Sequence, residues 1–166
     1  FEANIGGAFG PELKFAGYDG IVITGKADHA VFLRIEDERV TLEDAASIQG
    51  KGIFETEKWL EETVGPGVKS LCIGPAGENL VRYAAILNAD ARAAGRTGMG
   101  AVMGSKRLKA IAIRGKGRIP ISDKERFNQA ARSSAVGGAT SMPRSSPRSS
   151  RHSSCCFHAL SRRLAE

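Results

Sequence analysis

The chain has 166 residues, 42% of them hydrophobic and 25% charged, a composition typical of a folded globular domain rather than of a disordered chain. The net charge is +6, but residues 133–166 hold five arginines and one acid, so the rest lacks the basic face of a nucleic-acid-binding protein. No apolar run approaches the roughly 18 residues of a membrane span, and neither a signal peptide nor an initiator Met is present, so we expect a piece of a longer cytoplasmic protein with no membrane partner.

Up to residue 132, the apolar residues alternate between the two-residue period of strands and the spacing of amphipathic helices. We expect helices at 44–48, 55–64 and 101–108, with Trp59 and Leu60 facing inward. We expect strands at 20–25, 30–35, 39–42, 68–73, 80–87 and 109–115. Together these elements predict an α+β fold.

The composition changes abruptly near Arg132, inside a helix-like run at 122–132. Ten residues of the segment 133–166 are serine, and no apolar period continues there. A segment of this kind buries too little surface to offset the entropy that ordering removes. We therefore divide the chain into a body at 1–132 and a disordered or frame-shifted Ser/Arg-rich tail at 133–166.

The body contains an internal repeat at an offset of 90 residues. Each copy has a Gly-rich loop, a helix-like stretch and an apolar run that ends in Gly-Lys. The matched positions are Gly6 with Arg96, Gly10 with Gly100, Ile21 with Ile111, Ile23 with Ile113, Gly25 with Gly115 and Lys26 with Lys116. Two related halves would pack together and turn both loops toward one cleft. Such a cleft suits a phosphorylated ligand, because loop amides and helix N-termini favour anions.

Each of the two Gly-rich loops has a binding interpretation and a structural one. The glycines of residues 4–11 either let the backbone approach a ligand closely or form a turn before a helix. In residues 92–101, Arg92 and Arg96 flank small residues directly before a helix, a pattern suited to phosphate. Alternatively, Gly98 and Gly100 of this loop would allow close packing of that helix.

Other motifs indicate structural roles. Residues 20–26 have the spacing of a P-loop, but Ala27 replaces the magnesium-binding hydroxyl and strand formers fill the loop. Cys72 is expected to be a small buried hydrophobe in a strand. Glu12 and Glu78 lie near loops without a paired carboxylate for acid–base chemistry, so we expect solvated or capping roles for them.

Three blocks of the body, in order along the chain, carry a resemblance to a known family. They are NIGGAFGPELKFAGYDGIVITGK (4–26), IGPAGENLVR (73–82) and RAAGRTGMGAVMGSK (92–106), the last followed by LKAIA (108–112). Over about residues 1–130, the sequence resembles the N-terminal domain of tungsten-containing aldehyde ferredoxin oxidoreductases. That domain is α+β and is built from two related halves, which agrees with the 90-residue repeat.

The resemblance implies that the domain cradles a tungsten bis-pterin cofactor, whose two phosphates share a magnesium ion. The family's cofactor contacts correspond here to Asn4, Gly6, Arg92, Ala93, Gly95 and Arg96. The backbone carbonyls of Asn4 and Ala93 would help to hold Mg²⁺, which prefers oxygen ligands. The arginines would pair with phosphate or with the polar edge of the pterin, while the cofactor supplies the chemistry.

The resemblance also implies an activity for the longer parent protein. It would oxidise a small aldehyde to a carboxylic acid and pass the electrons through a 4Fe–4S cluster to ferredoxin. The cluster's cysteine ligands lie in later domains of the family, outside this chain, so we expect the chain alone to be inactive. Action on other acids or on aromatic thioesters, molybdenum in place of tungsten, and a homo-oligomeric state stay open. The alternative function is a stand-alone binding module for a phosphorylated ligand, with a basic disordered arm.

Overall fold

The structure is a computed structural model that describes residues 2–88, 91–140 and 155–156. Its contacts divide the chain into two compact units. The first unit extends to Gly117 and includes residues 155–156, whereas the second begins at Arg118 and contains the helix α5 (Lys124–Thr140). Within the described residues, no helix has the length and apolar character that crossing a bilayer requires.

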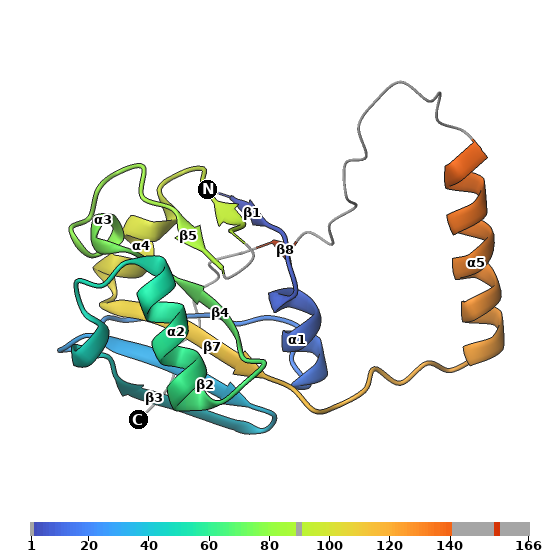
Figure 1. Cartoon of the computed structure of the whole chain (residues 1–166), viewed down its shortest axis with the longest axis horizontal. Coiled ribbons are helices and arrows are strands. Elements are labelled where there is room, and N and C mark those ends of the chain that lie inside the picture. The colour runs from blue at the N-terminus through green and yellow to red at the C-terminus, as the bar shows by residue number, and fades with distance from the viewer. Residues whose placement is uncertain (1, 89–90, 141–154, 157–166) are drawn as a thin grey trace. The chain divides into compact units, whose positions relative to one another are not determined.

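A six-stranded mixed sheet forms the centre of the first unit (Figure 1). In spatial order, its strands are β3 (Arg39–Asp44), β2 (Val31–Glu36), β7 (Leu108–Arg114), β4 (Lys69–Cys72), β5 (Ile86–Leu87) and β6 (Ala93–Ala94). Strands β2 and β7 run parallel, and the other neighbouring pairs of this sheet are antiparallel. The central strand β7 is buried from Leu108 to Ile113, as expected of a largely apolar strand with neighbours on both sides. A separate two-stranded pair joins β1 (Asn4–Ile5) to β8 (Cys155–Cys156).

Helices cover both faces of the sheet, because successive side chains of a strand point to opposite sides. The helices of this unit are α1 (Phe9–Phe15), the 3₁₀ helix η1 (Ala46–Ile48), α2 (Ile53–Val64), α3 (Pro75–Glu78) and α4 (Met99–Ser105). Helices α1 and α4 pack on the face that carries Ile111 and Ile113 of β7. Helices η1 and α2 pack on the opposite face, where the rings of Phe32 and Trp59 meet edge to face with centroids 5.5 Å apart.

Most of the predicted elements are confirmed. The strands expected at 30–35, 39–42, 68–73 and 109–115 are β2, β3, β4 and β7, and the helices expected at 44–48, 55–64 and 101–108 are η1, α2 and α4. Leu60 is fully buried, and Trp59 is partly buried in the same cluster, as the helical spacing predicted. A mixed sheet with helices on both faces also confirms the α+β class.

The strand predicted at 20–25 is wrong, although its alternation of side chains is real. Ile21 and Ile23 pack against the core, whereas Val22 is 45% exposed. However, none of the described strands pairs with this segment, so no ladder of hydrogen bonds forms there. The apolar pattern thus sets which side chains face inward without making a strand.

The strand predicted at 80–87 is also wrong for most of its length. Turn hydrogen bonds occupy its first residues: the Leu80 N–H donates to the Gly77 carbonyl at 3.0 Å, and the Ala84 N–H donates to the Val81 carbonyl at 2.9 Å. Leu80 itself has a φ of 58°, which is incompatible with a strand. Only Ile86–Leu87 remain to form β5.

The repeat at an offset of 90 residues has a structural counterpart. Helices α1 and α4 have seven residues each, and both their first and their last residues differ by 90 positions. The two copies also exchange similar hydrogen bonds. The Gly117 N–H donates to the Phe15 carbonyl, and the Ala27 N–H donates to the Lys106 carbonyl, both at 3.1 Å. In each case, a residue just beyond one copy's apolar run bonds to the other copy's helix terminus, at the last residue of α1 in one case and at the residue that follows α4 in the other.

The tail predicted at 133–166 is described only in part. Helix α5 crosses the predicted boundary after residue 132 and extends to Thr140. Residues 155–156 pair with β1. The remaining tail residues, 141–154 and 157–166, lie outside the described residues, so disorder or a shifted reading frame stays a prediction for them.

Candidate functional site

The two loops singled out from the sequence lie side by side in the first unit. Strand β1 of the first loop contacts strand β6 of the second. A cavity of about 740 Å³ opens between the two segments, and its lining residues are Glu2, Ala3, Asn4, Ala93, Gly95 and Arg96. Four of the six predicted cofactor residues therefore surround one cavity.

The short strands explain why these residues face the cavity. In the first loop, Asn4 is exposed, while its neighbours Ala3 and Ile5 are buried in the core. In the second loop, Ala93 and Gly95 are exposed on either side of the buried Ala94. The two-residue period of extended backbone thus turns alternate residues of both segments away from the core.

The other two predicted residues, Gly6 and Arg92, are joined by a residue that the sequence analysis missed. Asn88 is 5% exposed and follows directly after β5. Its side-chain Nδ2 donates to the Gly6 carbonyl at 2.8 Å, and its Oδ1 accepts from the Arg92 N–H at 3.0 Å. The signal in the sequence was one amide at the end of an apolar run, directly before the second loop.

The glycines of the second loop divide into two kinds. Gly98 has a φ of +69°, and a Cβ placed there would overlap the Arg82 carbonyl oxygen. A Cβ at Gly100 would lie 2.6 Å from the Ala85 carbonyl oxygen, so close helix packing requires these two glycines. At Gly95, by contrast, the nearest atom to an added Cβ is the Ala93 Cβ at 3.9 Å, and φ is not positive. The described fold therefore does not require glycine at position 95.

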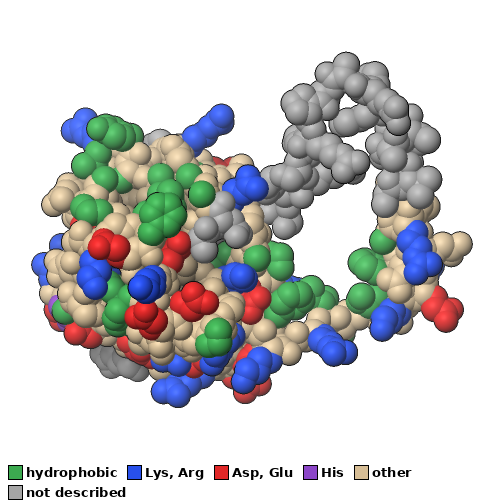
Figure 2. Space-filling view, in the orientation of Figure 1, with side chains coloured by type: hydrophobic (Ala, Val, Ile, Leu, Met, Phe, Trp, Pro, Cys, Tyr) green, Lys and Arg blue, Asp and Glu red, His purple; other side chains and the backbone are tan. Residues whose placement is uncertain are grey.

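The arginines of the second loop differ from those that serve the fold. Arg34 and Arg114 both form ion pairs with Glu36. Arg92 and Arg96 are exposed, and among the described residues neither takes part in an ion pair. On the face shown in Figure 2, acidic and basic side chains of the first unit are interspersed, in keeping with the nearly balanced charge of residues 1–132.

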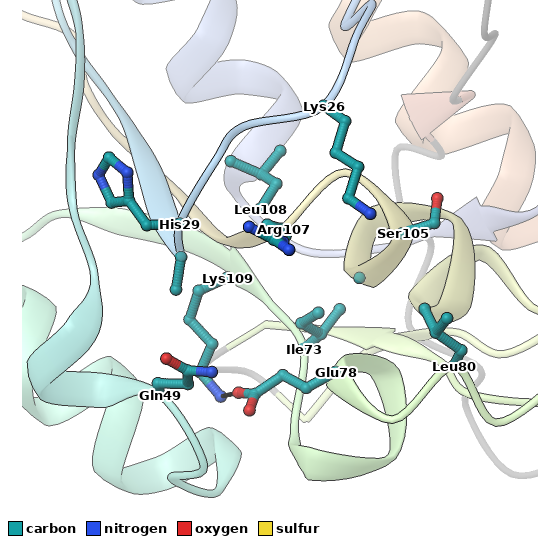
Figure 3. Close-up of a pocket in the computed structure, with 12 residues that line it drawn as sticks. Lys26, His29, Gln49, Ile73, Glu78, Leu80, Ser105, Arg107, Leu108 and Lys109 are labelled. Carbon is teal, nitrogen blue, oxygen red and sulfur yellow. Dashed lines mark hydrogen bonds and ion pairs between the residues drawn. The ribbon is translucent and has the colours of Figure 1, made fainter.

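A second cavity, of about 440 Å³, is lined by the ion-paired side chains of Lys109 and Glu78 (Figure 3). Lys109 of β7 is 2% exposed, pairs with Glu78 and donates to the Lys51 carbonyl at 2.8 Å. The Glu78 carboxylate also accepts from the Gly50 N–H at 2.8 Å. Glu78 thus fastens the segment before α2 to the sheet, so it is an ion-pair partner of a buried lysine rather than the solvated or capping residue that we expected.

Glu12 and Cys72 have the structural roles that the sequence predicted. The Glu12 carboxylate accepts from the Gly115 N–H at 2.8 Å, so it caps the end of β7. Cys72 is fully buried in β4. Burial, followed by the nearby Glu57 charge, raises the pKa of the Cys72 thiol to about 12, so the thiol stays protonated at neutral pH.

Comparison with known proteins identifies the class to which this fold and these loops belong. The family model for the aldehyde ferredoxin oxidoreductase N-terminal domain matches residues 1–115, and the chain belongs to that family.

Individual relatives sharpen this assignment. The chain is 57% identical over 131 residues to a tungsten-containing aldehyde ferredoxin oxidoreductase of Pyrococcus abyssi, a match that covers 78% of this chain and 22% of the relative. It is 57% identical over 126 residues to the protein of the same name in Pyrococcus furiosus, covering 75% of this chain and 21% of the relative. The chain thus spans about a fifth of the length of these enzymes. These relatives do not favour a stand-alone binding module.

More distant relatives have different names. The WOR-like subunit of an aliphatic sulfonate oxidoreductase of Pyrococcus furiosus is 42% identical over 132 residues, covering 71% of this chain and 21% of that protein. Among solved structures, the active-site complex BamBC of benzoyl coenzyme A reductase matches with a TM-score of 0.78 and 35% identity. That match covers 87% of this chain and 23% of the reductase chain.

Proposed function

We propose that the first unit forms one side of a cradle for a tungsten bis-pterin cofactor in a longer oxidoreductase. That protein would oxidise a small aldehyde to a carboxylic acid and pass the electrons through a 4Fe–4S cluster to ferredoxin. The observation that carries the proposal is the convergence of the two loops on one cavity, with Asn4 on one side and Ala93, Gly95 and Arg96 on the other. The names of the relatives support tungsten and the substrate class.

The residues present fit such a cofactor. Arg92 and Arg96 are exposed next to the cavity and offer the planar donor groups that bind phosphate. Gly95 lines the cavity at a point where the described fold does not need a glycine, as expected where a ligand approaches the backbone. Asn4 and Ala93, whose carbonyl oxygens would be magnesium ligands, line the same cavity. When bound, the cofactor would supply the two-electron oxidation, and these residues would bind and orient it.

The two related halves support the same proposal. Helices α1 and α4 follow the first and the second loop at matched positions, and the reciprocal hydrogen bonds of Gly117 and Ala27 join the copies. A ligand that carries two equivalent phosphorylated arms suits a cleft made from two equivalent loops. We infer that the repeat exists because the cofactor has two pterins.

The test is the tungsten content of the full-length protein that carries this domain. Arg96→Ala should lower tungsten per chain about tenfold or more, because a hydrogen bond to a charged group contributes roughly 1.5–3 kcal/mol. Arg39→Ala, which removes an exposed arginine of β3, is the matched control and should keep the tungsten content of the unmodified protein. Unchanged tungsten in the Arg96→Ala protein would contradict the proposed contact.

A second variant separates binding from folding. Gly95→Ala adds a methyl group at the cavity without a clash in the described fold, so the free energy of unfolding of the chain should change by less than about 0.5 kcal/mol. The same substitution should still lower the tungsten content, because the added Cβ would occupy space that the cofactor needs. A Gly95→Ala protein with normal stability and normal tungsten would count against a close approach of the cofactor at this residue.

A further inference from the structure

We propose that Asn88 is a positioning residue for the cofactor, because its buried amide sets the spacing between the two loops. This inference rests on the proposed function. Asn88 bonds to the Gly6 carbonyl at 2.8 Å and to the Arg92 N–H at 3.0 Å, and these two partners belong to different loops. Its own backbone N–H also donates to the Arg92 carbonyl at 3.1 Å.

The chemistry of the two partners calls for an amide side chain. Gly6 presents a carbonyl oxygen, which needs a donor, and Arg92 presents an N–H, which needs an acceptor. Asparagine supplies one of each from a single short side chain. An ionised aspartate would offer acceptors only, and a leucine of similar shape would leave these two partly buried backbone groups without this partner.

The position of this bridge connects it to the cavity. Ala93, which lines the cavity, directly follows Arg92, and Asn4 lies two residues before Gly6. The strands that carry the loops, β1 and β6, have only two residues each, so they give little rigidity by themselves. A second side-chain bond across the gap, from Thr97 Oγ1 to the Glu2 carbonyl, is longer, at 3.5 Å. Asn88 therefore supplies a well-formed side-chain link between the loops, and it preorganises them for a ligand that must contact both.

Asn88→Asp tests this role with almost no change in shape. At about pH 8, the new carboxylate keeps the acceptor for Arg92 but faces the Gly6 carbonyl with a second acceptor. Tungsten should then leave the full-length protein about tenfold faster during dialysis, the effect of one lost hydrogen bond. Near pH 5, the buried aspartate is protonated, because burial and the facing carbonyl raise its pKa, and its O–H donates to Gly6 again. Retention should therefore recover at the lower pH, which a general loss of stability would not produce.

The matched control is Asn79→Asp, which makes the same chemical change at an exposed asparagine of the first unit. It should retain tungsten as the unmodified protein does at both pH values. If Asn88→Asp also retains tungsten as well as the unmodified protein, the positioning role is wrong, while the Arg96→Ala result still decides the proposed function.

A measurement on the unmodified 166-residue chain needs no variant. Nuclear magnetic resonance should detect a coupling across the hydrogen bond between the Asn88 side-chain nitrogen and the Gly6 carbonyl carbon. Absence of this coupling in the folded chain would overturn the bridge, whatever the tungsten content. A coupling in the chain together with no tungsten in the full-length protein would overturn the proposed function, and with it the role of the bridge toward the cofactor.

Discussion

Each repeat copy ends in an apolar run, which contains Ile21 and Ile23 in the first copy and Ile111 and Ile113 in the second. The two runs share a sequence pattern but not a structure. In the second copy, Ile111 and Ile113 lie in β7, which hydrogen-bonds to β2 on one side and to β4 on the other. In the first copy, Ile21 and Ile23 lie in a segment without a described strand partner and are only partly buried. The same alternation of apolar residues thus produces a buried strand where other strands lie on both sides. Where none of the described strands is adjacent, it produces a segment that packs on the core without strand pairing.

The largest expected difference between the copies concerns the residues at the N-caps of the equivalent helices. Gly98 at α4 has a positive φ and no space for a Cβ, whereas Ala8 at α1 has a φ of −88°. Gly98→Ala should lower the free energy of unfolding by about 4 kcal/mol or prevent folding, because strain and overlap with backbone add together. Ala8→Gly should lower it by about 1 kcal/mol or less. Urea unfolding of the two variants measures both values, and similar losses would show that the caps are equivalent after all.

A smaller difference is expected for the matched isoleucines. Ile113 is fully buried, so Ile113→Ala should lower the free energy of unfolding by about 3 kcal/mol through lost burial and the cavity that remains. Ile23, its counterpart, is partly exposed, and Ile23→Ala should lower it by about 1 kcal/mol. Denaturant titration gives both numbers. Equal losses would mean that the first copy's segment is as well packed as β7.

The smallest expected effect concerns charge at the ends of these segments. Arg114 ends β7 and pairs with Glu36, whereas the equivalent position in the first copy is the uncharged Thr24. Burial alone would raise the pKa of Glu36, but the hydrogen bonds and charges of Arg34 and Arg114 outweigh it and hold the pKa below its ordinary value of 4.5. Folding therefore favours the ionised carboxylate. The resulting stability is present above about pH 4.5 and is lost as the pH falls through the lowered pKa of the folded state.

Glu36→Gln isolates this contribution. The variant should lose at most about 1 kcal/mol at neutral pH, and its stability should fall less steeply than that of the unmodified chain below about pH 4.5. Thermal unfolding at a series of pH values measures both slopes. Parallel curves for the two proteins would show that the Glu36 ion pairs do not stabilise the fold.

The local pattern of apolar residues predicted most strands of the sheet, because β2, β4 and β7 carry apolar side chains in the hydrophobic clusters on both faces of the sheet. It failed at 20–25 and 80–87, where the outcome depends on a missing neighbour and on turns closed by Gly77. Pairing partners and turn hydrogen bonds are properties of the surrounding chain, and a window of alternating residues does not contain them.

The sequence likewise predicted some residues of the candidate site and missed others. The repeat and the resemblance selected Asn4, Ala93, Gly95 and Arg96, which the structure brings to one cavity, while their roles toward a cofactor stay predictions. Asn88 was missed because one of its two partners, Gly6, is 82 positions away. The packing role of Gly98 depends on the Arg82 carbonyl in the same way, since only the folded backbone places that oxygen beside it.

The parallel pairing of β2 with β7 has a consequence for the order in which the chain becomes structured during synthesis. β7 is the last strand of the six-stranded sheet to leave the ribosome, yet it lies at the centre, between β2 and β4. Until Arg114 has emerged, the β2–β3 hairpin and β4 each expose an unpaired edge to the cell. The nascent domain is therefore most vulnerable to aggregation just before its final strand inserts, and closing contacts so far apart in sequence makes that insertion slow.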